Sequence, residues 1–164
     1  MGVFLLKLQQ YPPIHDISTD TTLPPQFRHV KALRHPVHNS VEYDSRAGEL
    51  QRSAYPSIQP LFFDLPPSIL LSAIEALASN ESWVLHHVDF QQGLIEASES
   101  THVLGFVDDI IIRVQANGLG SRVDIRSASR VGVSDLGANA DRIEQFSASL
   151  DFVAEKLVAK TKGI

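Results

Sequence analysis

The pattern of apolar positions predicts two helices. Apolar residues recur every three or four positions in two segments of the chain, which is the spacing of one face of an α-helix. The first segment predicts a helix over residues 65–80, and the second predicts a helix from Ala140 to about Lys160. Asn139 precedes the second helix, and we interpret it as the N-cap. The apolar positions are Leu70, Leu71, Ile74 and Leu77 in the first helix and Ile143, Phe146, Leu150, Val153 and Leu157 in the second.

The region between the two helices has the pattern of β-strands. Runs rich in β-branched and apolar residues predict four strands, which cover residues 83–90, 94–98, 105–116 and 121–130. Residues 101–104 either continue the second strand or form a loop, and residues 117–120 form a strong hairpin turn. We therefore predict an α+β fold in which two helices pack on one face of a four-stranded antiparallel sheet, in the order helix-β-β-β-β-helix.

The last hairpin also predicts which side chains face the core. A four-residue loop at residues 117–120 places Val114 opposite Val123, and the same face continues to Asp108 opposite Ser129. The core face therefore turns polar at its end, where a loop over residues 130–139 begins, and buried polar groups must find partners there.

The other face of this hairpin carries charges. Arg113 lies opposite Asp124, and Asp109 lies diagonal to Arg126 and is expected to pair with a neighbouring arginine. Because opposite charges alternate along this face, we expect it to be exposed to solvent.

Residues 1–60 have no sustained helical or strand period and are punctuated by prolines. We predict an extended arm over residues 1–60 that packs on a core over residues 61–164, within a single domain. A disordered tail is the alternative, and the spread of large apolar residues speaks against it. The expected docking points are Leu5, Ile14, Ile17, Phe27, Val30, Tyr55, Ile58 and Leu61.

Composition limits the classes of function. The 164 residues have 43% hydrophobic and 20% charged content, as in ordinary globular proteins, and a net charge of -5 that argues against a nucleic-acid partner. No cysteine is present, which excludes disulfides and thiolate metal sites. No phosphate-binding glycine motif or nucleophile elbow is found, and we predict no cofactor.

The densest polar chemistry lies in residues 126–142, with three arginines, two aspartates, three serines and an asparagine. Arg126, Arg130 and Arg142 could converge on one anion, with amides at the helix N-terminus completing the site. Alternatively the loop is structural, with Asp135 and Asp108 accepting from the arginines and the serines satisfying the backbone. The candidate ligand-binding residues are Arg126, Ser129, Arg130, Asp135, Asn139, Arg142, Asp108 and His15.

Histidines provide weaker candidates. His15 with Asp16 and Asp20 could hold a divalent metal or act as an acid–base pair, but a four-ligand shell is not visible and we predict no metal site. His86 and His87 are adjacent on a predicted strand, so we expect them to point to opposite faces, where they cannot share a metal.

Four motifs resemble the bacterial "domain of unknown function 1499" family. They cover residues 12–20, 55–60, 105–114 and 121–140, in the family's order. The resemblance implies no catalytic assignment. Related proteins often carry membrane-spanning segments before the first motif, where this chain has eleven residues. The resemblance therefore implies a periplasmic or membrane-associated envelope location, with a cytoplasmic location as the alternative, and any membrane attachment through a segment absent from this chain.

These observations favour a non-enzymatic, envelope-associated binding or interaction domain. Its polar loop would hold an anionic small molecule or dock an envelope protein partner. The alternative is a small-molecule enzyme that acts on an acidic substrate, with His15 or Asp108 as the proton-transfer group. A pocket lined by both His15 and the 126–142 loop would favour the enzyme. The sequence predicts no oligomeric state.

Overall fold

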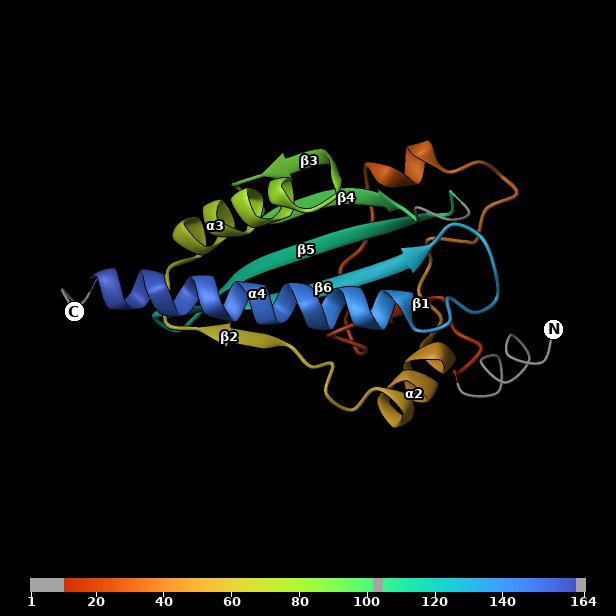
Figure 1. The fold of residues 1–164 in the computed structure, drawn as a ribbon, viewed down its shortest axis with the longest axis horizontal. Helices are drawn as coiled ribbons and strands as arrows, with labels where there is room; N and C mark the ends of the chain where they lie inside the picture. The colour runs from red at the N-terminus through yellow and green to blue at the C-terminus, as the bar shows by residue number, and fades with distance from the viewer. Residues whose placement is uncertain (1–10, 102–104, 162–164) are drawn as a thin grey trace.

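The computed structural model describes residues 11–101 and 105–161, so the predictions for Leu5 and for residues 102–104 lie outside the described residues. The fold is α+β with an antiparallel sheet, as predicted (Figure 1). In chain order the elements are β1 (Asp16–Ser18), a 3-10 helix η1 (Val30–Leu33), α2 (Ser45–Ala54), β2 (Leu61–Phe63), α3 (Pro67–Asn80), β3 (Val84–Asp89), β4 (Leu94–Ser100), β5 (Val107–Asn117), β6 (Gly120–Ser129) and α4 (Ala138–Thr161).

The sheet has six strands, and the prediction of four was wrong. The four long strands lie in the order β6-β5-β4-β3, and both β1 and β2 pair with the outer edge of β6. β1 lies in the arm and β2 begins directly after it, and each has only three residues, which is too short for an alternating pattern to be recognised. The arm also supplies α2 and η1, which sequence periodicity did not predict.

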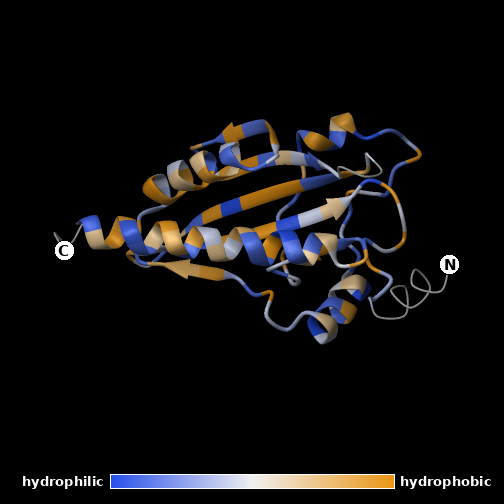
Figure 2. Ribbon diagram, viewed as in Figure 1, coloured by the Kyte–Doolittle hydropathy of each residue, from blue (hydrophilic) through white to orange (hydrophobic). Residues whose placement is uncertain are grey.

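Helices α3 and α4 pack side by side on one face of the sheet, as predicted (Figure 1). The core between them and the sheet is apolar in the middle of β5, and β5 becomes hydrophilic at the end that lies near the start of α4 (Figure 2). Asp108 and Ser129 are paired at this end, as the predicted register required. The register was right although the loop is shorter than predicted, because Asn117 pairs with Gly120 and leaves only two residues in the turn.

The opposite face of the sheet is buried, so the prediction of solvent exposure was wrong. The arm crosses this face, and its Phe27, Val30 and Val41 pack on Ile111 and Ala128. The charged side chains predicted for this face lie beneath the arm, where each has an oppositely charged partner, so they can be buried without leaving an isolated charge. They are Asp109, Asp124 and Arg126, each fully buried, and the largely buried Arg113.

Apolar residues of the arm, together with Leu61, pack on both faces of the sheet. Ile14, Ile17 and Ile58 join the main core, Phe27 and Val30 pack on the opposite face, and Tyr55 and Leu61 are partly buried against the main core. Within residues 11–101 and 105–161, no helix is long and apolar enough to cross a membrane.

Candidate functional site

Arg142, in the second turn of α4, is the centre of a hydrogen-bonded network at the polar end of the sheet. Its Nε donates to Glu99 Oε2 (2.6 Å), and its Nη2 donates to Asp108 Oδ2 (2.7 Å). Its Nη1 donates to Ser127 Oγ (2.9 Å) and to Asn139 Oδ1 (2.7 Å). The arginine side chain is 10% exposed, so the ends of β4, β5 and β6 and the first turns of α4 fix its position.

Asp135, not Asn139, caps α4, which corrects the sequence-based interpretation. Its carboxylate accepts from the backbone N–H groups of Gly137 and Asn139 (2.9 Å each). Burial raises the pKa of Asp135, and these two hydrogen bonds act against that shift. The cap requires left-handed backbone at Leu136 (φ 53°) and Gly137 (φ 88°), and a side chain such as leucine adopts that conformation only at a cost in energy.

Because Asp135 provides the cap, the Asn139 side chain turns inward. Its Oδ1 accepts from Ser127 Oγ (2.6 Å), and its Nδ2 donates to Ser129 Oγ (2.9 Å) and to the His15 carbonyl (3.1 Å). Asn139 is fully buried, so this network ties the start of α4 to β6 and to the arm. The polar end of the core therefore has the partners that burial demands.

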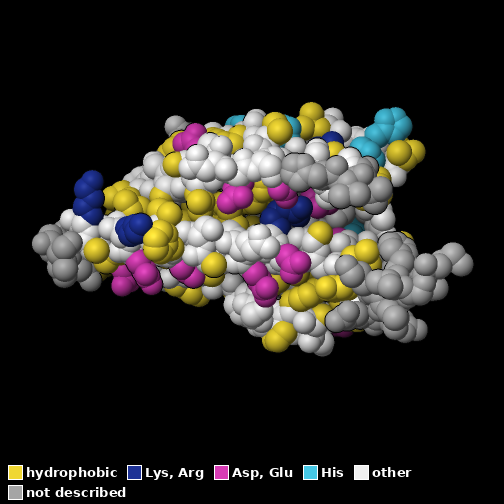
Figure 3. Space-filling view, viewed as in Figure 1, with side chains coloured by type: hydrophobic (Ala, Val, Ile, Leu, Met, Phe, Trp, Pro, Cys, Tyr) yellow, Lys and Arg dark blue, Asp and Glu magenta, His cyan; other side chains and the backbone are white. Residues whose placement is uncertain are grey.

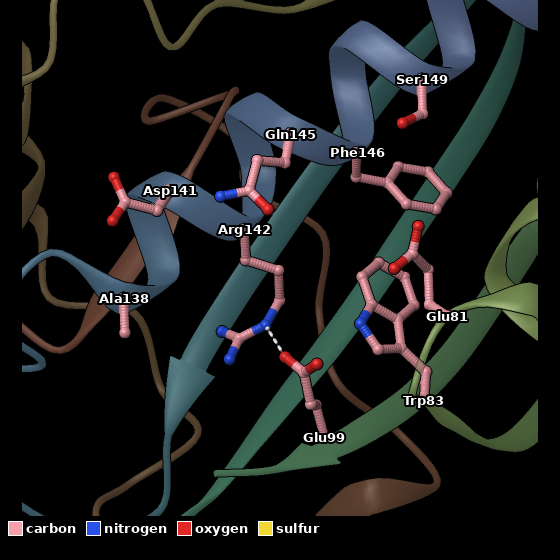
Figure 4. Close-up of a pocket in the computed structure, with 9 residues that line it drawn as sticks. All are labelled: Glu81, Trp83, Glu99, Ala138, Asp141, Arg142, Gln145, Phe146 and Ser149. Carbon is pink, nitrogen blue, oxygen red and sulfur yellow. Dashed lines mark hydrogen bonds and ion pairs between the residues drawn. The ribbon is translucent and has the colours of Figure 1, made fainter. Parts of the chain in front are cut away.

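A hollow of about 250 Å³ opens beside Arg142, and we call it the Arg142 hollow (Figure 4). Trp83 and Phe146 form its aromatic side, with their rings stacked at 4.7 Å between centroids. Figure 4 shows the guanidinium of Arg142 and the carboxylate of Glu99 pointing toward each other, with the Trp83 ring on the side of Glu99 that is away from Arg142. The lining residues are Glu81, Trp83, Glu99, Ala138, Asp141, Arg142, Gln145, Phe146 and Ser149.

The lining of the Arg142 hollow is acidic. Glu81, Glu99 and Asp141 contribute three carboxylates against the one guanidinium of Arg142. The space-filling view shows basic atoms flanked by acidic atoms between α4 and the strands (Figure 3). Four of the five guanidinium N–H groups donate to Glu99, Asp108, Ser127 and Asn139, so the pair of parallel N–H groups that grips a carboxylate or phosphate is not free.

A second hollow of about 390 Å³ lies on the other side of Ala138, beneath the loop that leads to α4. Phe106, Val131 and Leu136 give it apolar walls. The predicted site residues Asp108, Ser129 and Asp135 also line it. Asp108 thus borders this hollow while its carboxylate is held by Arg142.

Arg126 and Arg130 lie on the other face of the sheet from Arg142, so the three arginines do not converge on one anion. Arg126 makes two hydrogen bonds to Asp16 (2.9 and 2.7 Å) and also donates to backbone carbonyls of the arm. Arg130 pairs with Asp109 (2.8 Å), which also accepts from Arg34 (2.7 Å). Both arginines therefore fasten the arm and the end of the sheet.

The arm brings His15 to the 126–142 loop, but the backbone carbonyl of His15 makes the contacts there, not its imidazole. The His15 carbonyl accepts from Ser129 N (2.8 Å) and from Asn139. His15 lines another hollow, with Asn39 and Ser40, on the side of the arm. Asp20 pairs with Arg113 and Arg122. Among the described residues, no three His, Asp or Glu side chains come together as a metal site.

A β-bulge changes the expected placement of His86 and His87. The pairing of β3 with β4 shifts register between Leu85 and His87, and both imidazoles lie on the arm side of the sheet. His86 Nε2 is 2.7 Å from Ser98 Oγ, and the His87 ring stacks on His29 at 3.5 Å. The prediction of opposite faces was wrong, because an added residue in one strand breaks the two-residue period.

Glu81, Trp83 and Glu99 were missed as site residues by sequence reasoning. Trp83 was read as core, and it is both a core residue and part of the hollow. A signal existed for Glu99, because it pairs with Asp108 across β4 and β5 and therefore shares the polar end of the core face. Glu81 lies outside any strand or helix, so no period places it.

The fold and the site define a class of protein: a small α+β domain with an arm-covered sheet and a polar hollow at the start of its last helix. The model of the family described as "Protein of unknown function (DUF1499)" matches residues 16–150, and the chain belongs to this family. The resemblance seen in the four sequence motifs is thereby confirmed. A search of curated proteins found no match.

Proposed function

We propose that the domain is a non-catalytic binding domain that holds a small molecule in the Arg142 hollow. The observation that carries this proposal is an aromatic wall that lies beside three carboxylates, one of which, Glu99, is held in place by Arg142. Residues locked by packing and hydrogen bonds bind ligands with little loss of conformational entropy.

The charge of the hollow favours a ligand with an amine or another cationic group. Glu81 and Asp141 are exposed at the rim, and Glu99 lies deeper, beside the Trp83 ring (Figure 4). A cation beside such a ring is attracted by the π electrons of the ring face and by the negative charges of the adjacent carboxylates. The anionic ligand expected from the sequence has less support, because the guanidinium of Arg142 is already engaged by Glu99 and Asp108.

An enzyme that uses His15 or Asp108 has less support than a binding domain. His15 lines a hollow different from those that contain Arg142 or Asp108. Asp108 is 2% exposed and its carboxylate is paired with Arg142, which leaves it poorly placed to meet a substrate. An envelope location and an envelope partner stay predictions that rest on the family resemblance.

The single tryptophan of the chain allows a direct test. The indole N–H signal of Trp83 in a ¹⁵N-labelled protein is followed while phenethylammonium chloride or sodium phenylacetate is added at neutral pH. We expect phenethylammonium to shift the signal to saturation and phenylacetate to leave it unchanged. Glu81→Gln with Asp141→Asn should weaken phenethylammonium binding by about fivefold, since each exposed carboxylate contributes up to about 1 kcal/mol. Glu49→Gln, on α2, is the matched control.

Native mass spectrometry of the gently purified protein complements this titration. A bound mass that disappears on denaturation and on Glu81→Gln with Asp141→Asn supports the proposal and identifies the ligand. A shift caused by phenylacetate alone would overturn the cationic class of the ligand but not the binding role. No response to either probe, together with a bare mass, would leave the Arg142 network as a structural element and refute the proposed function.

A further inference from the structure

Another concave surface lies along the C-terminal half of α4, where β2 runs beside it (Figure 1). We call it the β2–α4 groove, and its volume is about 460 Å³. Apolar atoms of Phe63, Ala154 and Val158 form its floor, and Phe62, which is 61% exposed, adds a large aromatic side chain at its border. The full lining is Phe62, Phe63, Asp64, Asp151, Ala154, Glu155, Val158 and Ala159.

All charged side chains of the groove are acidic. Asp64, Asp151 and Glu155 line it, and among residues 11–101 and 105–161 no lysine or arginine does. Asp151 and Glu155 are one helical turn apart, an arrangement in which like charges destabilise a helix. Burial, and then the charge of Glu155, raise the pKa of Asp151. Within the described part of the chain, none of the three carboxylates forms an ion pair with a lysine or arginine, so no ion pair there offsets the repulsion between Asp151 and Glu155.

We propose that the β2–α4 groove docks a segment of a partner protein that carries apolar side chains together with lysine or arginine. The apolar floor would take the apolar side chains, as in the recognition of an amphipathic helix by a groove. The cations of the segment would pair with Asp64, Asp151 and Glu155 at the rim, which relieves the repulsion along α4. An anionic lipid surface has the wrong charge for this rim. This inference is independent of the Arg142 hollow.

The test uses a defined probe, a fluorescein-labelled fourteen-residue peptide of leucine and lysine with helical spacing of its leucines. The same peptide with glutamate in place of lysine is its charge-reversed control. Fluorescence anisotropy at physiological salt should show saturable binding of the lysine peptide to the intact chain and none of the glutamate peptide. Asp151→Asn with Glu155→Gln should weaken binding by about tenfold, because two of the three complementary charges are lost.

A matched pair of substitutions separates the groove from net charge. Ala159→Arg places a cation and a long side chain within the groove, whereas Ala76→Arg makes the same change on the exposed side of α3. Both positions are exposed and helical, so both variants should fold, which circular dichroism checks. We expect Ala159→Arg to abolish peptide binding and Ala76→Arg to preserve it.

Equal binding by the two arginine variants, or equal binding of the two peptides, would overturn the proposal. Absence of peptide binding to the unmodified chain would overturn it too. A dimer of the unmodified chain that Ala159→Arg dissociates in sedimentation experiments would replace the partner segment with a second copy of the protein.

Discussion

Arg126 and Asp16 form a two-point ion pair inside the protein, although 110 residues separate them in the sequence. The pair joins the longest hairpin of the sheet to the first strand of the arm, and the Arg126 side chain is fully buried. Arg126 also donates to the carbonyls of Pro25 and Val41, and its guanidinium lies 4.8 Å from the centre of the Phe27 ring. One side chain thus holds three separate points of the arm.

Asp16→Asn should therefore destabilise the protein strongly. Removing one partner of a buried ion pair leaves an uncompensated charge, so we expect the free energy of unfolding to fall by about 3–5 kcal/mol. Chemical denaturation followed by tryptophan fluorescence measures it. Adding Arg126→Met should recover part of the loss, whereas Arg46→Ala, which breaks the exposed pair with Asp44, should leave the unfolding transition in place. A loss below about 1 kcal/mol for Asp16→Asn would contradict this role.

Glu96 should control the attachment of η1. Its buried carboxylate accepts from the backbone N–H groups of Arg28, His29 and Val30, at 2.9–3.1 Å. Hydrogen bonds to a charged acceptor contribute about 1.5–3 kcal/mol, so Glu96→Gln should lower the free energy of unfolding within that range. Hydrogen exchange should accelerate at residues 28–30 more than in β5. Uniform acceleration throughout the sheet would mean that Glu96 supports the whole fold rather than this segment.

Two glycines with similar backbone conformations should respond differently to alanine. Gly93 has a φ of 66° and Gly118 a φ of 60°, so both variants are strained by about 1 kcal/mol. An added Cβ at Gly93 would lie 2.2 Å from the Val114 carbonyl oxygen, whereas nothing lies within 4 Å at Gly118. Gly93→Ala should thus cost clearly more stability than Gly118→Ala in thermal unfolding. Equal losses of stability in the two variants would show that the backbone near Gly93 and Val114 shifts at little cost in energy.

Asp135 should make stability depend on pH. Its pKa is raised in the folded protein because the carboxyl is buried, so protonation favours the folded state. The contribution of Asp135 to the free energy of unfolding is therefore fully present below the unfolded pKa of 3.8. It is lost as the pH rises through the higher pKa of the folded protein. Denaturation at a series of pH values should show the unmodified protein losing stability relative to Asp135→Asn over this window. A difference that is constant with pH would contradict the raised pKa.

The register of β5 and β6 could be predicted from the sequence. Side chains alternate between the two faces of a sheet, so only two arrangements are possible, and the apolar positions show which face is the core. That register already separated Arg126 from Asp108 and Ser129, since it placed them on opposite faces. The burial of the charged face was not readable, because it depends on where the arm runs. The arm contacts the sheet through β1, a strand of three residues, and through side-chain pairs, and neither leaves a periodic signal.

The Arg142 hollow was only partly readable for a similar reason. Arg142 and Asn139 stand in the polar stretch that the sequence singles out, the hairpin register places Asp108 at the polar end of the core face, and the structure joins all three. Glu81 and Trp83 lie in the short connection between α3 and β3, and only tertiary packing brings them to α4. Asp135 caps the helix instead of Asn139 because the left-handed backbone at Leu136 and Gly137 turns the chain back. This turn brings the Asp135 carboxylate to the backbone N–H of Asn139.

The pairing of β1 with β6 has a consequence for the order in which the chain acquires its shape. A ribosome releases the arm first, but Asp16, Ile17 and Ser18 have no strand to pair with until Arg126, Ser127 and Ala128 have been added. The loop that this pairing closes spans most of the protein, and closing it costs entropy that local hairpins avoid. The hairpins of β3 to β6 can therefore form before the arm is locked, and until then the charges of the covered face remain in water.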